Sequence, residues 1–199
     1  MSYIAFSQFT GDSSNFESDL EVARKQFTAL GATRLSGSVA LTGEAVGSIT
    51  IATAWDTADG YFDARPQVVA DPQMIALMQA RGLTPVQTSF AEVYGETGTP
   101  EGKYVVSVIA VTEVHTPEAT QAVVAAASNV MQANGVNGMR FARAIAAGQQ
   151  SGIYVTLAYV DSLDDYLAAS AAALADSAFG SAMSNAKGQI VMRQFNRML

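Results

Sequence analysis

The chain has 199 residues, no cysteine, a single histidine and a formal net charge of −7, with hydrophobic residues making up 49% of it. This composition excludes a disulfide framework, a thiolate zinc site, a cysteine nucleophile and a multi-histidine metal centre. It also argues against a nucleic-acid partner, because phosphate contacts require clustered lysine and arginine side chains.

The N-terminal segment predicts neither a signal peptide nor a membrane anchor. Residues 1–10 lack the basic stretch and the long apolar stretch of a signal peptide. The longest uncharged run, residues 119–139, carries too many glutamine, asparagine and serine side chains to span a bilayer. We therefore expect a cytoplasmic protein with no membrane partner.

The first half of the chain predicts the element order β-α-β-β-α-β. Apolar runs with the length of strands occupy residues 3–9, 35–41, 48–55 and 86–94. A helix is predicted to start at the cap residues within 11–14 and to end at Gly31. A second helix is predicted to start at Asp56-Thr57, to be interrupted by Pro66 and to restart at Asp71, whose side chain caps it.

The second half predicts the same order. Its strands are expected at residues 104–111, 139–145, 153–160 and 190–195. Thr116, followed by a proline, is expected to cap the first helix of this half. The second helix is expected to begin at Asp161-Ser162 and to restart near Asp176.

The two halves are repeats of one another at an offset of 105 residues. Residues 47–56 resemble residues 152–161. The same offset relates Tyr61 to Tyr166, Asp71 to Asp176, Met78 to Met183, and Phe90 to Phe195. We therefore predict a first ferredoxin-like repeat at residues 1–96, a Gly-, Thr- and Pro-containing linker at 97–102, and a second repeat at 103–199.

The predicted fold class is α+β. A β-α-β-β-α-β unit forms a four-stranded antiparallel sheet with both helices on one face. The strands here are apolar at nearly every position, which is typical of strands buried on both faces. We therefore predict two tandem ferredoxin-like repeats packed sheet to sheet as one pseudo-symmetric α+β barrel, in a monomeric pseudo-dimer or a homodimer.

Short sequence motifs also resemble those of a known protein family. Trp55-Asp56-Thr57 and the later segment 70–74 are similar to the tryptophan, acidic turn and Asp-Pro restart of NIPSNAP-like domains, and residues 159–166 are a looser match. The chain thus resembles the dimeric α/β-barrel superfamily in tandem-repeat form, and more distantly its antibiotic-biosynthesis monooxygenases. Those monooxygenases often carry a histidine in the helix after the third strand. Residues 63–65 and 168–170 contain none, which argues against that activity.

Two single residues are candidates for a ligand site. His115 could act as a general base or a haem ligand, or it could be a loop residue that precedes a helix cap. Trp55, the only tryptophan, could form a wall of a ligand cavity or pack in the core against the following helix.

Arginines in the strands are the more informative candidates. Arg143 stands between two alanines in an apolar strand, and a buried guanidinium needs a carboxylate or a bound anion as its partner. Glu92 and Glu113 are available for an internal ion pair, and an acidic ligand is the alternative. Arg193 lies in the last strand. The predicted ligand-binding set is Trp55, Glu92, His115, Arg143 and Arg193, and no catalytic residue is predicted.

The aspartates are spaced as helix caps, and we predict no metal site and no cofactor. Three functions stay open. The protein could bind a small, partly apolar, acidic or phenolic molecule in the barrel. It could be a cofactor-independent monooxygenase or isomerase acting on an aromatic or polyketide-like substrate. It could also be a structural or interaction module with a filled barrel.

Overall fold

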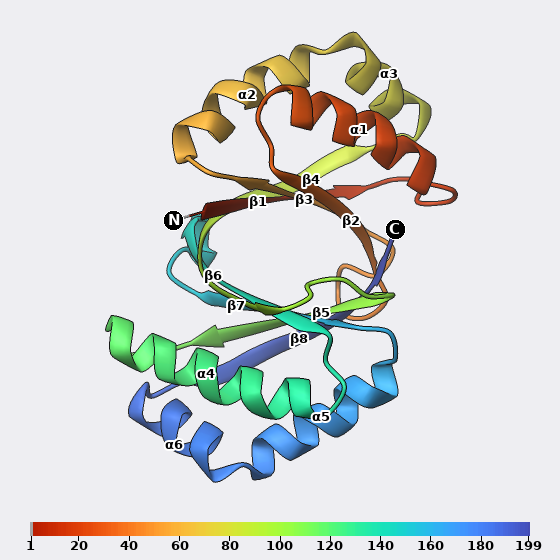
Figure 1. Ribbon diagram of the computed structural model, residues 1–199. Coiled ribbons are helices and arrows are strands. Elements are labelled where there is room, and N and C mark those ends of the chain that lie inside the picture. The colour runs from red at the N-terminus through yellow and green to blue at the C-terminus, as the bar shows by residue number, and fades with distance from the viewer. Residues whose placement is uncertain (1) are drawn as a thin grey trace. The chain divides into compact units, whose positions relative to one another are not determined.

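The computed structural model describes residues 2–199. Figure 1 shows strands and helices alternating as the sequence predicts. The elements are β1 (Ser2–Thr10), α1 (Glu17–Ala29), β2 (Arg34–Ala40), β3 (Ile49–Trp55), α2 (Ala58–Ala70), α3 (Pro72–Ala80), β4 (Thr84–Gly98), β5 (Tyr104–Val111), α4 (Pro117–Ala133), β6 (Gly138–Ala146), a 3₁₀ turn (Gly148–Gln150), β7 (Tyr154–Val160), α5 (Leu163–Ala175), α6 (Ser177–Asn185) and β8 (Gln189–Met198).

The described chain divides into two compact units. The first contains residues up to 92 together with 145–149 and 197–199, and the second contains 93–144 and 150–196. The long strands β4 and β8 contribute to both units, so a boundary between the units lies inside each of these strands. The predicted linker 97–102 coincides with the end of β4 and the loop that follows.

The first unit has a ferredoxin-like sheet. β1 and β2 pair antiparallel with the two edges of β3, with Tyr3 opposite Trp55 and Arg34 opposite Ala54. The first part of β4 lies beside β1, which gives the strand order β4-β1-β3-β2. Helices α1, α2 and α3 cover one face of this sheet (Figure 1).

The second unit has the same order, β8-β5-β7-β6. Tyr104 in β5 lies opposite Val160 in β7, and Arg143 in β6 lies opposite Tyr154 in β7. Helices α4, α5 and α6 cover one face of this sheet (Figure 1). The α+β class and the two ferredoxin-like repeats are thus confirmed, while the packing of one repeat on the other stays a prediction.

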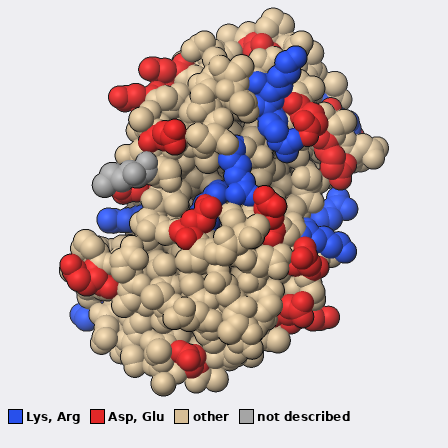
Figure 2. Space-filling model, in the orientation of Figure 1, with Lys and Arg blue, Asp and Glu red and all other residues tan. Residues whose placement is uncertain are grey.

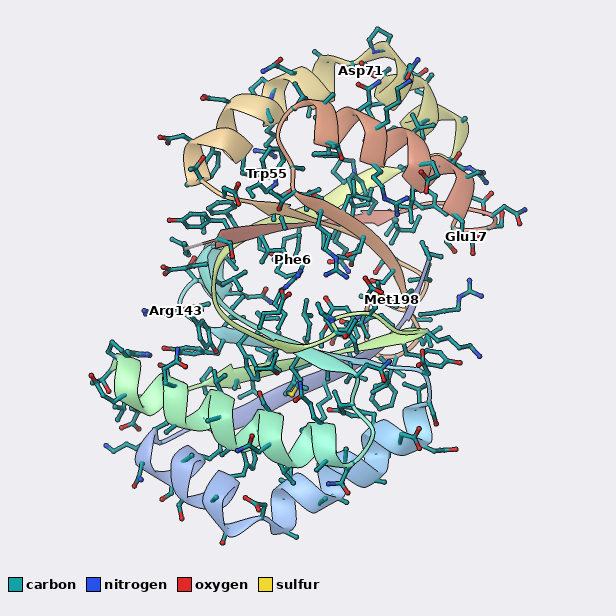
Figure 3. The ribbon with its side chains drawn as sticks, viewed as in Figure 1. Phe6, Glu17, Trp55, Asp71, Arg143 and Met198 are labelled. Carbon is teal, nitrogen blue, oxygen red and sulfur yellow. The ribbon has the colours of Figure 1, made fainter. Side chains whose placement is uncertain are left out.

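The helix caps explain why each second helix is broken in two. Asp71 accepts hydrogen bonds from the backbone N–H groups of Gln73 and Met74, and Asp176 accepts one from Phe179. A side-chain oxygen at this position satisfies a free N–H of the first helical turn. Figure 3 shows Asp71 at the junction of α2 and α3.

Two predicted helix boundaries are wrong. Pro66 lies inside the continuous helix α2 and does not interrupt it; the chain turns only at Asp71. Asp12 does not cap α1, because its carboxylate bonds the backbone and hydroxyl of Ser14 in a preceding turn. The helix begins at Glu17, without a side-chain cap.

Charged side chains are sparse over the helices of the second unit. On the face shown in Figure 2, few lysine, arginine or acidic residues lie over α4, α5 and α6. Among residues 2–199, no helix is both long enough and apolar enough to cross a membrane.

Candidate functional site

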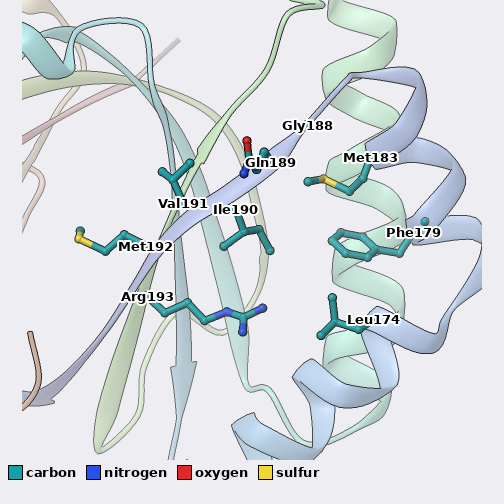
Figure 4. A pocket seen from close by; sticks show the side chains of 10 residues that line it. Leu174, Phe179, Met183, Gly188, Gln189, Ile190, Val191, Met192 and Arg193 are labelled. Atoms are coloured by element: carbon teal, nitrogen blue, oxygen red, sulfur yellow. The ribbon is translucent and has the colours of Figure 1, made fainter.

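A shallow, open groove lies on the second unit. It has a volume of about 560 Å³ and lies between the α5–α6 corner and β8 (Figure 4). Its apolar walls come from both helices and the strand: Leu174, Phe179, Met183, Ile190, Val191 and Met192.

Local sequence features bring β8 alongside α6. The Asp176 cap turns the chain between α5 and α6, so that Phe179 and Met183 face the strand (Figure 4). Lys187 then adopts a left-handed conformation with φ 49°, which closes a tight turn. Gly188 follows, and a Cβ atom there would lie 2.8 Å from the Met183 methyl group. Glycine therefore leaves room for the Met183 side chain against the start of the strand.

A smaller space continues from the groove beneath the helices. It has a volume of about 80 Å³ and shares Leu174, Phe179, Met183, Ile190 and Arg193 with the groove. Side chains of α4, of α5 and of the helix-covered sheet face complete its walls. The site thus has an open outer part and a narrow apolar inner part, a shape that suits a small amphipathic molecule.

Arg193 is the only charged residue among the described residues that line either space. It extends from β8 toward Leu174 (Figure 4). Within residues 2–199, Arg193 forms no ion pair. The groove therefore offers a guanidinium, without a carboxylate partner, beside an apolar surface.

Tyr166 lies next to this cation. Burial raises the pKa of the Tyr166 hydroxyl, while Arg193 and a hydrogen bond with Ser170 act in the opposite direction. The Phe195 ring packs edge-on against Tyr166, with 5.9 Å between the ring centroids. The hydroxyl thus stays protonated at neutral pH and can act as a hydrogen-bond donor.

A second polar cluster in the same unit surrounds Tyr154. Its hydroxyl lies 3.3 Å from Nδ1 of His115, and the two rings are stacked. The Arg143 guanidinium lies over the Tyr154 ring, 5.8 Å from its centroid. Tyr94 packs edge-on against Tyr154, and burial raises the pKa of the Tyr94 hydroxyl. Two of the predicted ligand-binding residues, His115 and Arg143, are thus brought together by a tyrosine.

The expectation that Arg143 is buried is wrong. Its side chain is exposed, and it lies on the helix-covered face of the sheet, because Met139 and Phe141, which alternate with it, line the space beneath α4. The buried strand arginine is Arg140. Its Nε and Nη2 atoms both lie 2.6 Å from Oε2 of Glu96.

The remaining predicted residues have separate surroundings. Trp55 is buried in the first unit between α2 and the sheet (Figure 3), and its indole N–H donates to the hydroxyl of Thr53 at 2.9 Å. Glu92 is half-buried in β4. Glu113, considered as a partner for a strand arginine, instead pairs with Lys187 at 2.7 Å.

Sequence reasoning missed Tyr94, Tyr154 and Tyr166 as site residues. Tyr154 lies opposite Arg143 across a hairpin, so a known hairpin register would have identified the pair. Tyr166 is visible in the sequence only as an equivalent of Tyr61, a signal of repetition and not of chemistry.

Comparison with solved structures agrees with this architecture. A chlorite dismutase from Candidatus Nitrospira defluvii matches 100% of this chain and 90% of its own, with a TM-score of 0.60 and 11% identity. A heme-binding protein from Thermus thermophilus matches 100% and 91%, with a TM-score of 0.58 and 9% identity. A protein described as a monooxygenase from Lactobacillus acidophilus matches 100% and 94%, with a TM-score of 0.57 and 9% identity.

The chain shares a two-repeat ferredoxin-like fold with these structures. Identities this low establish the fold and leave the function open. No protein-family model matches the chain, and no curated protein matches it in sequence. The closer resemblance to NIPSNAP-like domains stays a prediction.

The residues of the groove do not fit a haem group. Haem iron takes an axial histidine, cysteinate or tyrosinate, or a methionine together with a histidine. The single histidine, His115, does not line the groove. Burial raises the pKa of Tyr166, which opposes the tyrosinate form. Residues 2–199 also contain no cluster of three or more histidine or acidic side chains that could hold a metal ion.

Proposed function

We propose that the second unit binds a small, largely apolar carboxylic acid in the groove between α5, α6 and β8. The observation that carries this proposal is the pairing of an apolar groove with one uncompensated guanidinium, that of Arg193. The sequence-based hypothesis of a partly apolar, acidic ligand is kept, and its location is moved to the helix-covered side of the sheet.

Affinity and orientation come from different parts of the groove. Apolar contacts with Phe179, Met183 and Ile190 supply a non-directional attraction of about 25 cal/mol per Å² of buried apolar surface. The planar guanidinium of Arg193 matches the geometry of a carboxylate and fixes its direction. The protonated Tyr166 hydroxyl is a further donor beside the same cation.

The test compares acids with their neutral amides. Calorimetric titration with aromatic carboxylates such as 1-naphthoate is expected to show binding, and 1-naphthamide is expected to bind more weakly. Arg193→Met keeps most of the apolar length and is expected to weaken 1-naphthoate binding about tenfold. Binding of the amide should not change.

Arg197→Met is the matched control, because Arg197 lies four residues further along β8 and does not line the groove. It should leave acid binding intact. Equal losses for Arg193→Met and Arg197→Met, or equal affinity of acid and amide for the natural protein, would contradict recognition of the carboxylate by Arg193.

We propose, as a second candidate, a proton-transfer function at the Tyr154 cluster, which would suit the first step of cofactor-independent oxidation of a phenol. Its support is the contact of His115 with the Tyr154 hydroxyl beside Arg143. Because Tyr154 engages Nδ1, a substrate proton would go to Nε2 of His115. Arg143 would then stabilise the phenolate.

Oxygen uptake with an electron-rich phenol, measured on metal-free protein, tests this second function. His115→Gln is expected to lower the rate about a hundredfold, the typical contribution of a general base. Glu118→Gln, another exposed change close to His115 in the chain, should have no such effect. An unchanged rate in His115→Gln would remove His115 from any such reaction.

A further inference from the structure

The first unit has a groove beside residues 85–88 of β4, the strand segment that corresponds to residues 190–193 of β8 in the groove of the second unit. It has a volume of about 390 Å³ and lies between α2 and the first part of β4. Tyr61 and Phe62 of α2 face Phe90 of β4, with ring centroids 5.1 Å from Phe90 in both cases. The Phe62 side chain is 49% exposed, so an aromatic surface is open to solvent.

Both repeats contain an equivalent pair of aromatic residues. At the offset of 105 residues, Tyr61 corresponds to Tyr166 and Phe90 corresponds to Phe195. In each unit the tyrosine comes from the helix after the third strand of the repeat, and the phenylalanine comes from its last strand. The two rings are in contact in both units.

The arginine, in contrast, lies on the helix in the first repeat and on the last strand in the second. Arg65 on α2 stands where the second repeat has Ser170, and Thr88 on β4 stands where the second repeat has Arg193. All four residues line the spaces of their own units. Each unit therefore has one arginine and one hydroxyl residue at these two positions, with the helix and strand exchanged.

The exchange keeps the cation beside the tyrosine. Burial raises the pKa of the Tyr61 hydroxyl and Arg65 opposes it, as Arg193 does for Tyr166. Within residues 2–199, Arg65 also forms no ion pair. Both arginines are exposed, and the exchange leaves each unit with one guanidinium that a ligand can reach.

We infer that the first unit holds a second binding site, centred on Arg65, Tyr61 and Phe62, for the same class of small aromatic carboxylate. The inference rests on the proposed function of the second unit for the identity of the ligand class. The stacked rings of Tyr61 and Phe90 favour a planar ring as the apolar part of that ligand. The chain would then bind two molecules.

Separate reporters can follow the two sites in one titration with 1-naphthoate. Trp55 contacts Tyr61, with 5.7 Å between ring centroids, so its fluorescence reports on the first unit. The methyl group of Met183, observed by NMR, reports on the second unit. Both signals are expected to change, and calorimetry should give two sites per chain.

Arginine variants assign each signal to its site. Arg65→Ser should weaken the Trp55 response about tenfold and leave the Met183 response unchanged, and Arg193→Met should do the reverse. Arg24→Met, on the exposed side of α1 and outside the groove, is the control for Arg65. The double variant Arg65→Ser with Thr88→Arg rebuilds the arrangement of the second unit and should recover the lost affinity.

The outcomes separate this inference from the proposed function. A response of Met183 without one of Trp55 would overturn the second site and leave the proposed function standing. A response of Trp55 without one of Met183 would overturn the proposed function and support the site at Arg65. A Trp55 response that persists unweakened in Arg65→Ser, or no recovery in the double variant, would also overturn the inference.

Discussion

Glu96→Ala is expected to destabilise the protein more than Arg140→Met, although the two residues form one ion pair. The Arg140 side chain is 8% exposed, whereas that of Glu96 is 43% exposed. Removing the glutamate leaves a buried guanidinium without a partner, which costs about 3 kcal/mol. Removing the arginine leaves a carboxylate that water reaches, and methionine retains the apolar contacts, so the loss is about 1 kcal/mol.

Urea unfolding of both single variants and of the double variant measures this asymmetry. The double variant should be more stable than Glu96→Ala alone, because it contains no unpaired buried charge. Lys187→Met removes an ion pair whose two side chains are both exposed, and should change the free energy of unfolding by less than about 1 kcal/mol. Equal losses in Glu96→Ala and Arg140→Met would show that the guanidinium finds solvent without Glu96.

Strand β6, which carries Arg140 and Arg143, shows what the sequence could not predict. Residues 138–146 are apolar on both sides of the strand, so alternation cannot tell which of Arg140 and Arg143 is buried. The pairing of β6 with β7 in the sheet determines which arginine is buried. Arg143 lies opposite Tyr154 at the solvent end of the helix-covered face, and Arg140 lies on the other face.

The sequence did not identify Glu96 as the partner of Arg140, because it predicts the wrong end for strand β4. The sequence predicts that the strand ends at residue 94, because Gly95 and the glycines and threonines that follow are typical of a linker. β4 instead continues to Gly98, and this places Glu96 beside β6. Short-range sequence signals identify turns well. They carry no information on whether a neighbouring strand, here β6, extends the pairing of β4 beyond its predicted end.

Apart from the signal at Asp12, which does not cap α1, the local signals for helix caps were reliable. The caps at Thr57, Asp71, Thr116, Ser162 and Asp176 all accept from backbone N–H groups as predicted. The repeat offset was equally informative, because it identifies positions without any knowledge of packing. The groove beside β8 depends on how a helix corner meets a strand distant in the sheet, and no window of the sequence contains that information.

Trp55→Ala is expected to cost about 3–5 kcal/mol of unfolding free energy, as large-to-small changes of a buried aromatic residue do. Trp55 is 1% exposed and packs edge-on against Phe27 and Tyr61. Its N–H bond to Thr53 adds a second loss, because the buried hydroxyl of Thr53 would have to find another partner.

Trp55→Phe separates the core role of this residue from a role in ligand binding. It keeps an aromatic ring and should cost about 1–2 kcal/mol, through a smaller cavity and the lost N–H donor. Unfolding followed by circular dichroism gives the stability of both variants. Calorimetric titration with 1-naphthoate should give unchanged affinity for Trp55→Phe, because a residue this buried does not reach the ligand. A loss of affinity with little loss of stability would show instead that Trp55 forms part of a binding site.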